Sequence, residues 1–284
     1  MYEEFFGLSR KPFELQPDPA FMYLASRHKT ALNMLEYGLF NHDGFAVVTG
    51  EVGCGKTTVI RYLVERLGGN VTVGVVPNTH KAFGNIMQWT LIAFGLDYKK
   101  LTLAEAYETF ERFVVGEHER GKRVLFIIDE AQNLGEMNIE VLRLLSNITA
   151  HGKHVLHTAL VGQPELRKVL RQPSMRQVRQ RIAVAFHLTP LTEVETSHYM
   201  THRLELCGQT LSLFEAGAAP LMYLYSGGIP RLINVICDAA LVYAFGERAR
   251  TVSLKIVRQV VADRRATGLM SVMNAQNVPT TTPA

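Results

Sequence analysis

One stretch of the chain has the residue types and the spacing to bind a phosphate chain. It matches the pattern G-x-x-x-x-G-K-[ST], and it stands between an apolar run at residues 45–48 and an amphipathic run at residues 59–67. Its residues are Gly50, Glu51, Val52, Gly53, Cys54, Gly55, Lys56, Thr57 and Thr58. Because a strand, the full spacing and a helix occur together, we predict a phosphate-binding loop rather than an incidental glycine-rich turn.

Each residue type in this loop has a chemical reason. A loop around a triphosphate turns its backbone N–H groups inward and approaches the phosphates closely, which Gly53 and Gly55 permit. The helix that begins near Lys56 presents unpaired amides and the positive end of its dipole to the anion. We expect Lys56 to reach the β and γ phosphates and the Thr57 hydroxyl to ligate Mg²⁺. The stretch therefore predicts ATP and Mg²⁺ as ligands.

Two acids follow a second apolar run. Residues 124–128 are five consecutive large apolar residues, which is typical of a strand buried on both faces inside a parallel sheet. Because ligands of open α/β sheets lie off the carboxyl ends of the strands, the next two residues, Asp129 and Glu130, are expected beside the phosphate loop. We predict that Asp129 holds Mg²⁺ through water and that Glu130 orients and polarises the attacking water. The alternative is that one acid only caps the helix expected at residues 137–148.

Two further polar residues stand where they can contact the γ phosphate. Gln163 follows the strand expected at residues 154–161, where it can contact the γ phosphate or the lytic water; its alternative is a turn residue bonded to backbone. Arg231 follows Gly-Gly-Ile-Pro, and Pro230 suits the first turn of a helix. Arg231 then projects from a helix start and can report nucleotide state to the C-terminal helices. Its alternative is a surface or acid-paired arginine.

A basic segment between residues 167 and 181 contains no acid. Its members are Arg167, Lys168, Arg171, Arg176, Arg179 and Arg181. Such density is typical of a solvated helix face, of a nucleic-acid contact, or of arginines offered to the nucleotide of a neighbouring subunit. For the last of these we predict Arg181 as the finger that acts in trans, with Arg179 and then Arg176 as the alternatives.

The elements that must position these residues alternate as in an α/β fold. Aromatic residues and prolines at 1–21 indicate an extended arm that packs by its rings, and a helix is expected from Ser26. Strands are expected at 45–48, 71–76, 124–128, 154–161 and 183–188, helices at 81–94 and 103–119, and beyond Pro190 only helices. We predict an N-terminal arm and helix (1–43), a nucleotide-binding core (44–190), a helical lid (191–265) and a disordered tail (266–284).

Composition restricts the class of protein. The 284 residues are 47% hydrophobic, enough for one sizeable α/β domain and a smaller one, and a net charge of +4 does not by itself indicate nucleic acid. Three cysteines without metal-type spacing indicate a reducing compartment, which the cytoplasm provides. We expect no signal peptide, because the N-terminus carries Glu3 and Glu4 and lacks a basic region followed by an apolar one. We also expect no transmembrane segment, because the longest suitable uncharged run, residues 83–96, is too short to span a bilayer.

The order of these motifs resembles an AAA+ ATPase. Walker A corresponds to 50–57, Walker B to 124–130, sensor 1 to Gln163 and sensor 2 to Arg231. Further motifs are similar to the ExeA/GspA family, including stand-alone ATPases of the MshM type, over about residues 1–265. These motifs are Phe6-Gly7-Leu8, Pro12-Phe13, Pro17-Asp18-Pro19, Asp129-Glu130-Ala131-Gln132, Gly162-Gln163-Pro164-Glu165-Leu166 and Arg179-Gln180-Arg181-Ile182.

The resemblance implies a P-loop NTPase with a five-stranded parallel core and a C-terminal helical lid. It also implies a ring or filament that assembles with nucleotide, ATP hydrolysis at subunit interfaces, and support for the assembly of a secretion or type IV pilus machine. A second resemblance, to transposition ATPases of the TnsC/TniB kind, implies an ATP-dependent regulator whose partners are duplex DNA and a transposase. A third possibility is a scaffold that binds nucleotide without turnover.

Overall fold

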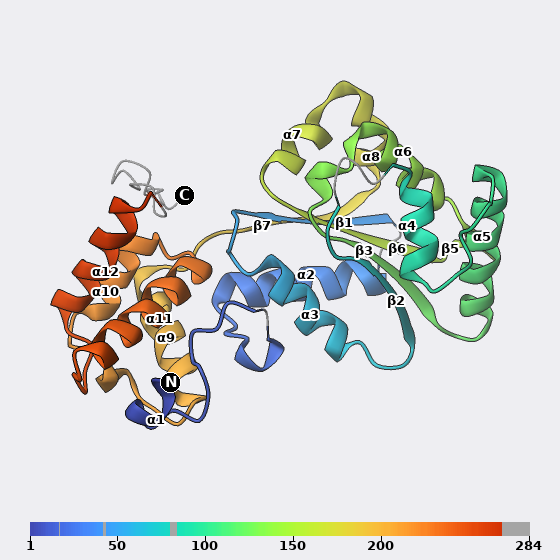
Figure 1. The fold of residues 1–284 in the computed structure, drawn as a ribbon. Coiled ribbons are helices and arrows are strands. Elements are labelled where there is room, and N and C mark those ends of the chain that lie inside the picture. The colour runs from blue at the N-terminus through green and yellow to red at the C-terminus, as the bar shows by residue number, and fades with distance from the viewer. Residues whose placement is uncertain (17, 42–43, 80–83, 269–284) are drawn as a thin grey trace. The chain divides into compact units, whose positions relative to one another are not determined.

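The computed structural model describes residues 1–16, 18–41, 44–79 and 84–268. The chain divides into two compact units (Figure 1). The sheet unit comprises Ser26–Val52 and Lys56–Thr189, and the helical unit comprises residues 1–25, Gly53–Gly55 and the chain from Pro190 onward.

The sheet unit is built on a five-stranded parallel sheet. Its strands, in spatial order, are β2 (Val71–Val76), β3 (Arg123–Ile128), β6 (Leu156–Gly162), β1 (Gly44–Gly50) and β7 (Ile182–Leu188). All four neighbouring pairs are parallel, so the carboxyl ends of the strands share one edge. This confirms the predicted α/β fold with a five-stranded parallel core.

Helices cover both faces of this sheet (Figure 1). They are α2 (Ser26–Asn41), α3 (Lys56–Arg66), α4 (Ile86–Ala93), α5 (Leu103–Glu119), α6 (Gly135–Leu145), α7 (Glu165–Arg171) and α8 (Arg176–Gln180). Side chains of β3 alternate between two buried faces, and Val124, Phe126 and Ile128 belong to the core beneath α4, α5 and α6. Leu125 and Ile127 are equally buried on the opposite face, which explains why β3 is apolar without interruption.

Local signals set most element ends. The predicted strand 71–76 and helix 103–119 are confirmed, and Thr102 and Glu105 form a capping box at the start of α5. The helix predicted at 81–94 begins instead at Ile86, because the Asn85 side chain accepts from the Met87 N–H and caps it there. Residues 81–83 of that prediction lie outside the described part of the chain.

The strand predicted at 154–161 also begins later, at Leu156. Residues 153–154 form a separate strand, β5, which pairs antiparallel with β4 (Thr149–Ala150). His151 and Gly152 between them both have positive φ, which gives the tight turn that reverses the chain.

The helical unit contains the four predicted C-terminal helices. They are α9 (Glu193–Glu205), α10 (Ala218–Ser226), α11 (Pro230–Gly246) and α12 (Leu254–Ala266). None of the helices in the described ranges combines the length and the apolarity that a bilayer crossing requires.

The N-terminal residues pack into the same unit. The arm is not fully extended as predicted: it contains α1 (Glu3–Phe6), which Gly7 ends in a left-handed conformation, and a 3₁₀ turn at Pro19–Phe21. The expected packing by aromatic rings is confirmed, since its rings are buried in the core of the helices. These rings belong to Tyr2, Phe6, Phe13 and Phe21.

Arg203 on α9 holds the arm in place. Only 6% of it is exposed, and its guanidinium donates to the carbonyls of Pro12 and Glu14 and to the Tyr199 hydroxyl. It also lies over the Phe21 ring, 4.4 Å from the centroid. Because these partners are neutral, the charge is stabilised by oriented dipoles and an aromatic face rather than by a carboxylate.

Candidate nucleotide-binding site

The predicted phosphate loop lies between the end of β1 and the start of α3. Gly53 and Gly55 have φ angles of +82° and +94°, a conformation that side-chain-bearing residues rarely adopt. The loop therefore has the backbone shape that the sequence pattern predicts. A segment of this shape can direct successive backbone N–H groups toward an anion.

Lys56, the first residue of α3, is buried, with 6% of its surface exposed. Its Nζ donates to the carbonyls of Gly50 at 2.8 Å and Glu51 at 3.0 Å. An ammonium group has three N–H donors, and within the described part of the chain the third has no acceptor. A buried cation with a spare donor at a helix start fits a phosphate group.

Thr57 and Asp129 bring the phosphate loop and β3 together. The Thr57 hydroxyl donates to Asp129 Oδ2 at 2.7 Å, and the Glu130 N–H donates to Oδ1 at 2.9 Å. Burial raises the pKa of Asp129, and these two hydrogen bonds oppose the rise only in part. A divalent cation would offset the cost of burying this carboxylate, so the donor set fits the predicted Mg²⁺.

The described residues contain no cluster of three or more His, Cys, Asp or Glu side chains able to hold a metal ion. A nucleotide-bound Mg²⁺ needs only one or two protein oxygens, because phosphate oxygens and water complete its coordination. The Thr57 hydroxyl would supply a protein oxygen, and Asp129 would hold the ion through water.

Glu130 stands in an unusual backbone conformation, with φ 54° and ψ 36°. For a residue other than glycine this costs about 1–3 kcal/mol. The Thr79 hydroxyl stabilises it by donating to the carbonyls of Asp129 at 3.2 Å and Glu130 at 2.5 Å, and Asn133 Nδ2 donates to the Thr79 carbonyl. Neither acid makes a side-chain cap to the helical turns that follow, so the capping alternative is not observed.

The Glu130 side chain is held by two amides. Gln163 Nε2 donates to Glu130 Oε2 at 3.0 Å, and Gln132 Nε2 donates to the same oxygen at 2.5 Å. Gln163 thus lies with Glu130, as expected for polar residues at the carboxyl edge of a parallel sheet.

Sequence reasoning missed Thr79, Gln132 and Asn133. One signal could have found Thr79, because it follows the end of β2 at the same sheet edge as the acids. Gln132 and Asn133 lie in a 3₁₀ turn after Glu130, and their contacts depend on a backbone conformation that the sequence does not show.

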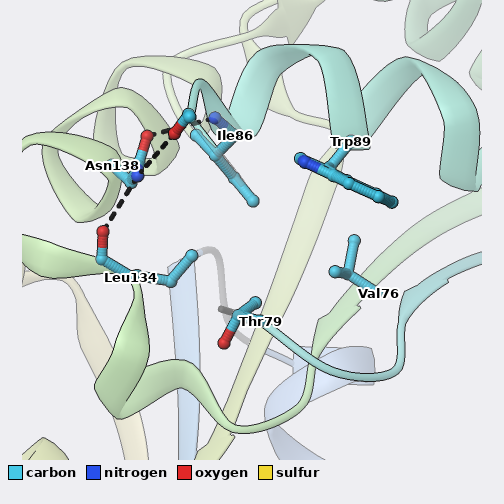
Figure 2. Close-up of a pocket in the computed structure, with 7 residues that line it drawn as sticks. Val76, Thr79, Ile86, Trp89, Leu134 and Asn138 are labelled. Carbon is cyan, nitrogen blue, oxygen red and sulfur yellow. Dashed lines mark hydrogen bonds between the residues drawn. The ribbon is translucent and has the colours of Figure 1, made fainter. Parts of the chain in front are cut away.

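A small cavity lies beside Thr79 (Figure 2). Its lining also includes Val76 and Trp89, and Asn138 bridges its rim by accepting from the Ile86 N–H at 3.1 Å and donating to the Leu134 carbonyl at 2.9 Å. These bonds fix the start of α4 against α6.

His187 is a further polar residue near the loop. Its Nδ1 lies 3.0 Å from the hydroxyl of Thr49, the last residue but one of β1. Burial lowers the pKa of His187, and the nearby positive charge of Arg167 lowers it further.

The basic segment separates into two groups. Arg179 Nη1 donates to the carbonyls of Leu170 and Gln172, both at 2.7 Å, and Arg181 Nη1 donates to the buried Ser146 hydroxyl at 2.8 Å. These two guanidiniums therefore brace their own unit. The other basic residues of the segment are exposed: Arg167, Lys168, Arg171 and Arg176.

Arg231 lies at the start of α11, in the helical unit to which Gly53 also belongs. Its backbone N–H donates to the Gly53 carbonyl at 3.2 Å, and a Cβ atom at Gly53 would lie only 2.7 Å from the Arg231 Cβ. Gly53 is thus in close contact with the helix start that carries Arg231. The side chain of Arg231 is exposed, and its predicted contact with the γ phosphate stays a prediction.

A five-stranded parallel sheet, a phosphate loop that leads into a helix, an Asp-Glu pair at the end of β3 and a C-terminal set of helices define the AAA+ class of P-loop NTPases, to which this chain belongs. Residues 40–170 match the family model described as an AAA domain. The chain is also 40% identical, over 246 residues, to general secretion pathway protein A of Aeromonas hydrophila. This confirms the resemblance to the ExeA/GspA family.

The matched region is 86% of this chain and 45% of that relative, so the chain spans less than half of the relative's length. Solved structures share the fold at low identity. The ADP form of the Aeropyrum pernix ORC2 protein has a TM-score of 0.67 and 19% identity, covering 93% of this chain and 75% of that one. A Walker-type ATPase of Pyrococcus abyssi has a TM-score of 0.63 and 18% identity, with 91% and 78% covered.

Proposed function

We propose that this protein binds ATP with Mg²⁺ and hydrolyses it to ADP and phosphate. The observation that carries the proposal is the 2.7 Å hydrogen bond from Thr57 to Asp129, which joins the phosphate loop to the acidic strand end. Two further observations support the proposal: the Lys56 ammonium is buried, and an amide donates to the Glu130 carboxylate. All of these groups lie in the sheet unit.

The residues then have separate tasks. Lys56 stabilises the β and γ phosphates, and Thr57 and Asp129 would hold Mg²⁺, which would supply positive charge beside the phosphate oxygens. Glu130 accepts the proton of a water molecule that attacks the γ phosphorus, and ADP leaves. Arg231 is proposed to contact the γ phosphate.

Phosphate release by purified protein tests the hydrolysis directly. Glu130→Gln is expected to bind ATP and to turn it over at least ~100-fold more slowly, in line with the loss of a general base. A wild-type protein that binds ATP but releases no phosphate at any protein concentration would instead be a nucleotide-binding scaffold.

We further propose that the protein assembles into rings or filaments with nucleotide, in the cytoplasm, and supports the assembly of a secretion or type IV pilus machine. The similarity to general secretion pathway protein A supports this task, and three buried cysteines that form no disulfide suit a reducing compartment. Elution of Glu130→Gln protein on a sizing column, with and without ATP, tests the assembly. An unchanged elution volume at micromolar protein would contradict it.

If Arg181 acts in trans, mixing Arg181→Ala with Glu130→Gln protein should restore part of the activity. The two defects then fall on different subunits of one interface, and some mixed interfaces are intact. If no mixing ratio of the two proteins restored ATPase activity, Arg181 would not be the arginine that acts in trans. Arg179 would then be tested in the same way.

The exposed basic group of α7 and α8 supports a second candidate, an ATP-dependent DNA-binding regulator of transposition. Its residues are Arg167, Lys168, Arg171 and Arg176. Contact with several phosphates predicts ATP-dependent binding of duplex DNA that weakens roughly tenfold or more over a modest rise in salt. Absence of duplex binding by ATP-loaded Glu130→Gln protein at low salt would exclude this function.

A further inference from the structure

Gln132 uses both ends of its side chain to connect the acid Glu130 to the end of β6. Its Nε2 donates to Glu130 Oε2 at 2.5 Å, and its Oε1 accepts from the Gln163 N–H at 2.9 Å. Glutamine can do both at once because its amide carries a donor and an acceptor on one planar group.

Both amides that hold Glu130 act on the same oxygen. Gln163 Nε2 donates to Oε2 at 3.0 Å, next to the donor of Gln132. A carboxylate oxygen has about two lone-pair sites, so these donors occupy Oε2. Among the described residues no donor contacts Oε1, which is thus the oxygen that can accept a proton. The two hydrogen bonds thus determine which oxygen of Glu130 accepts a proton, and they fix the orientation of the carboxylate.

The end of β6 is shaped to receive Gln132. A Cβ atom at Gly162 would lie 2.6 Å from Gln132 Oε1 and 3.4 Å from its backbone nitrogen. Any larger residue at this position would push the amide away from the strand. The position of the Gln132 amide against β6 thus depends on this glycine.

We propose that Gln132 is a positioning residue for ATP hydrolysis: it fixes the Glu130 carboxylate with Oε1 free to take the proton of the attacking water, and it ties that geometry to the strand end that carries Gln163. The inference rests on the proposed hydrolysis. Because a general base must meet its water within hydrogen-bond distance, loss of this constraint lowers turnover while the phosphate loop still binds nucleotide.

The sharpest variant is Gln132→Glu. It keeps the size of the side chain and an oxygen that accepts from the Gln163 N–H, but it removes the donor to Glu130 and places a second carboxylate beside it. We expect kcat to fall at least ~10-fold, with the ATP dissociation constant within about twofold of wild type. The matched control is Gln88→Glu, the same change at an exposed position of α4, which should keep wild-type kcat. Wild-type kcat in Gln132→Glu would overturn the proposal.

A measurement without catalysis tests the contact itself. In thermal unfolding without nucleotide, the Tm losses of Glu130→Ala and Gln132→Ala should not add, because each variant already breaks the same bond. Glu130→Ala combined with Gln88→Ala should add. Additive losses for the first pair would contradict the inference.

The two readouts separate this inference from the proposed function. If wild-type protein released no phosphate, the proposed hydrolysis would be wrong. The positioning role would then be wrong as well, even if the Tm losses showed the hydrogen bond between Gln132 and Glu130. If wild type and Gln88→Glu released phosphate equally and Gln132→Glu matched them, only the role of Gln132 would fail.

Discussion

The hydroxyl of Thr57, the second residue of α3, donates to Asp129 Oδ2 at the carboxyl end of β3 over 2.7 Å. Two segments 72 residues apart in sequence thus meet through the two protein oxygens that we assign to Mg²⁺. A contact of this kind preorganises the metal site, because neither ligand has to be brought in from solvent.

Thr57→Ala should therefore raise the Mg²⁺ concentration needed for half-maximal ATPase activity by at least ~10-fold, since one hard oxygen ligand is lost. Thr57→Ser keeps the hydroxyl and serves as the control, with a near wild-type requirement. A magnesium titration of phosphate release measures both. If the Ala and Ser variants needed the same Mg²⁺ concentration for half-maximal activity, Thr57 would not be a magnesium ligand.

Lys56→Ala should abolish measurable nucleotide binding. A charge-assisted contact of about 3 kcal/mol corresponds to roughly 100-fold in Kd, and this side chain is proposed to make more than one. Titration with a fluorescent ATP analogue checks the loss, and circular dichroism checks that the fold is retained. Wild-type affinity in a folded Lys56→Ala protein would overturn the assignment of the phosphate loop.

His187 should make stability depend on pH in a defined direction. Its pKa is lowered in the folded protein, so between that value and 6.5 the unfolded chain binds more protons than the folded one. The contribution of His187 to stability is thus present above 6.5 and is lost as the pH falls. His187→Gln should lose less stability than wild type as the pH falls. The Tm of both proteins, measured from pH 7.5 to 5, tests this. Parallel curves of Tm against pH would contradict the prediction.

Arg203→Lys should destabilise the helical unit by about 2–4 kcal/mol, because a lysine cannot reproduce the fork of donors to the carbonyls of the arm. Urea unfolding measures the loss, and limited proteolysis should cut within residues 1–25 sooner than in wild type. Arg258→Lys, at an exposed position of α12, is the control and should stay within about 0.5 kcal/mol. Equal stability of the two variants would show that the arm does not depend on Arg203.

Local rules predicted much of the fold. The alternation of apolar residues gave β2 its observed bounds, and the Thr102–Glu105 capping box fixed α5, because both patterns depend on neighbours in sequence. The phosphate loop was predictable for a similar reason, since its glycines and lysine lie within nine residues.

What depended on tertiary contacts was not predictable. Arg179 and Arg181 belong to a basic run in sequence, yet their partners are carbonyls and a serine hydroxyl that only the folded chain brings near. Gln132 belongs to the Asp129-Glu130-Ala131-Gln132 motif, but its contacts were not predictable, because they require the left-handed backbone of Glu130 and the close approach of β6. The prediction of an extended arm rested on Pro12, Pro17 and Pro19. The helical turn lies before these prolines and ends at Gly7.

The packing of residues 1–25 among helices that begin near residue 193 affects how the protein is made. The arm leaves the ribosome before its partner helices, which at about 5–20 residues per second follow roughly ten to thirty seconds later. During that interval four large aromatic rings have no native surface to cover them. A nascent chain of this protein should therefore be an early client of ribosome-associated chaperones, and translational pauses before α9 should lower the yield of native protein.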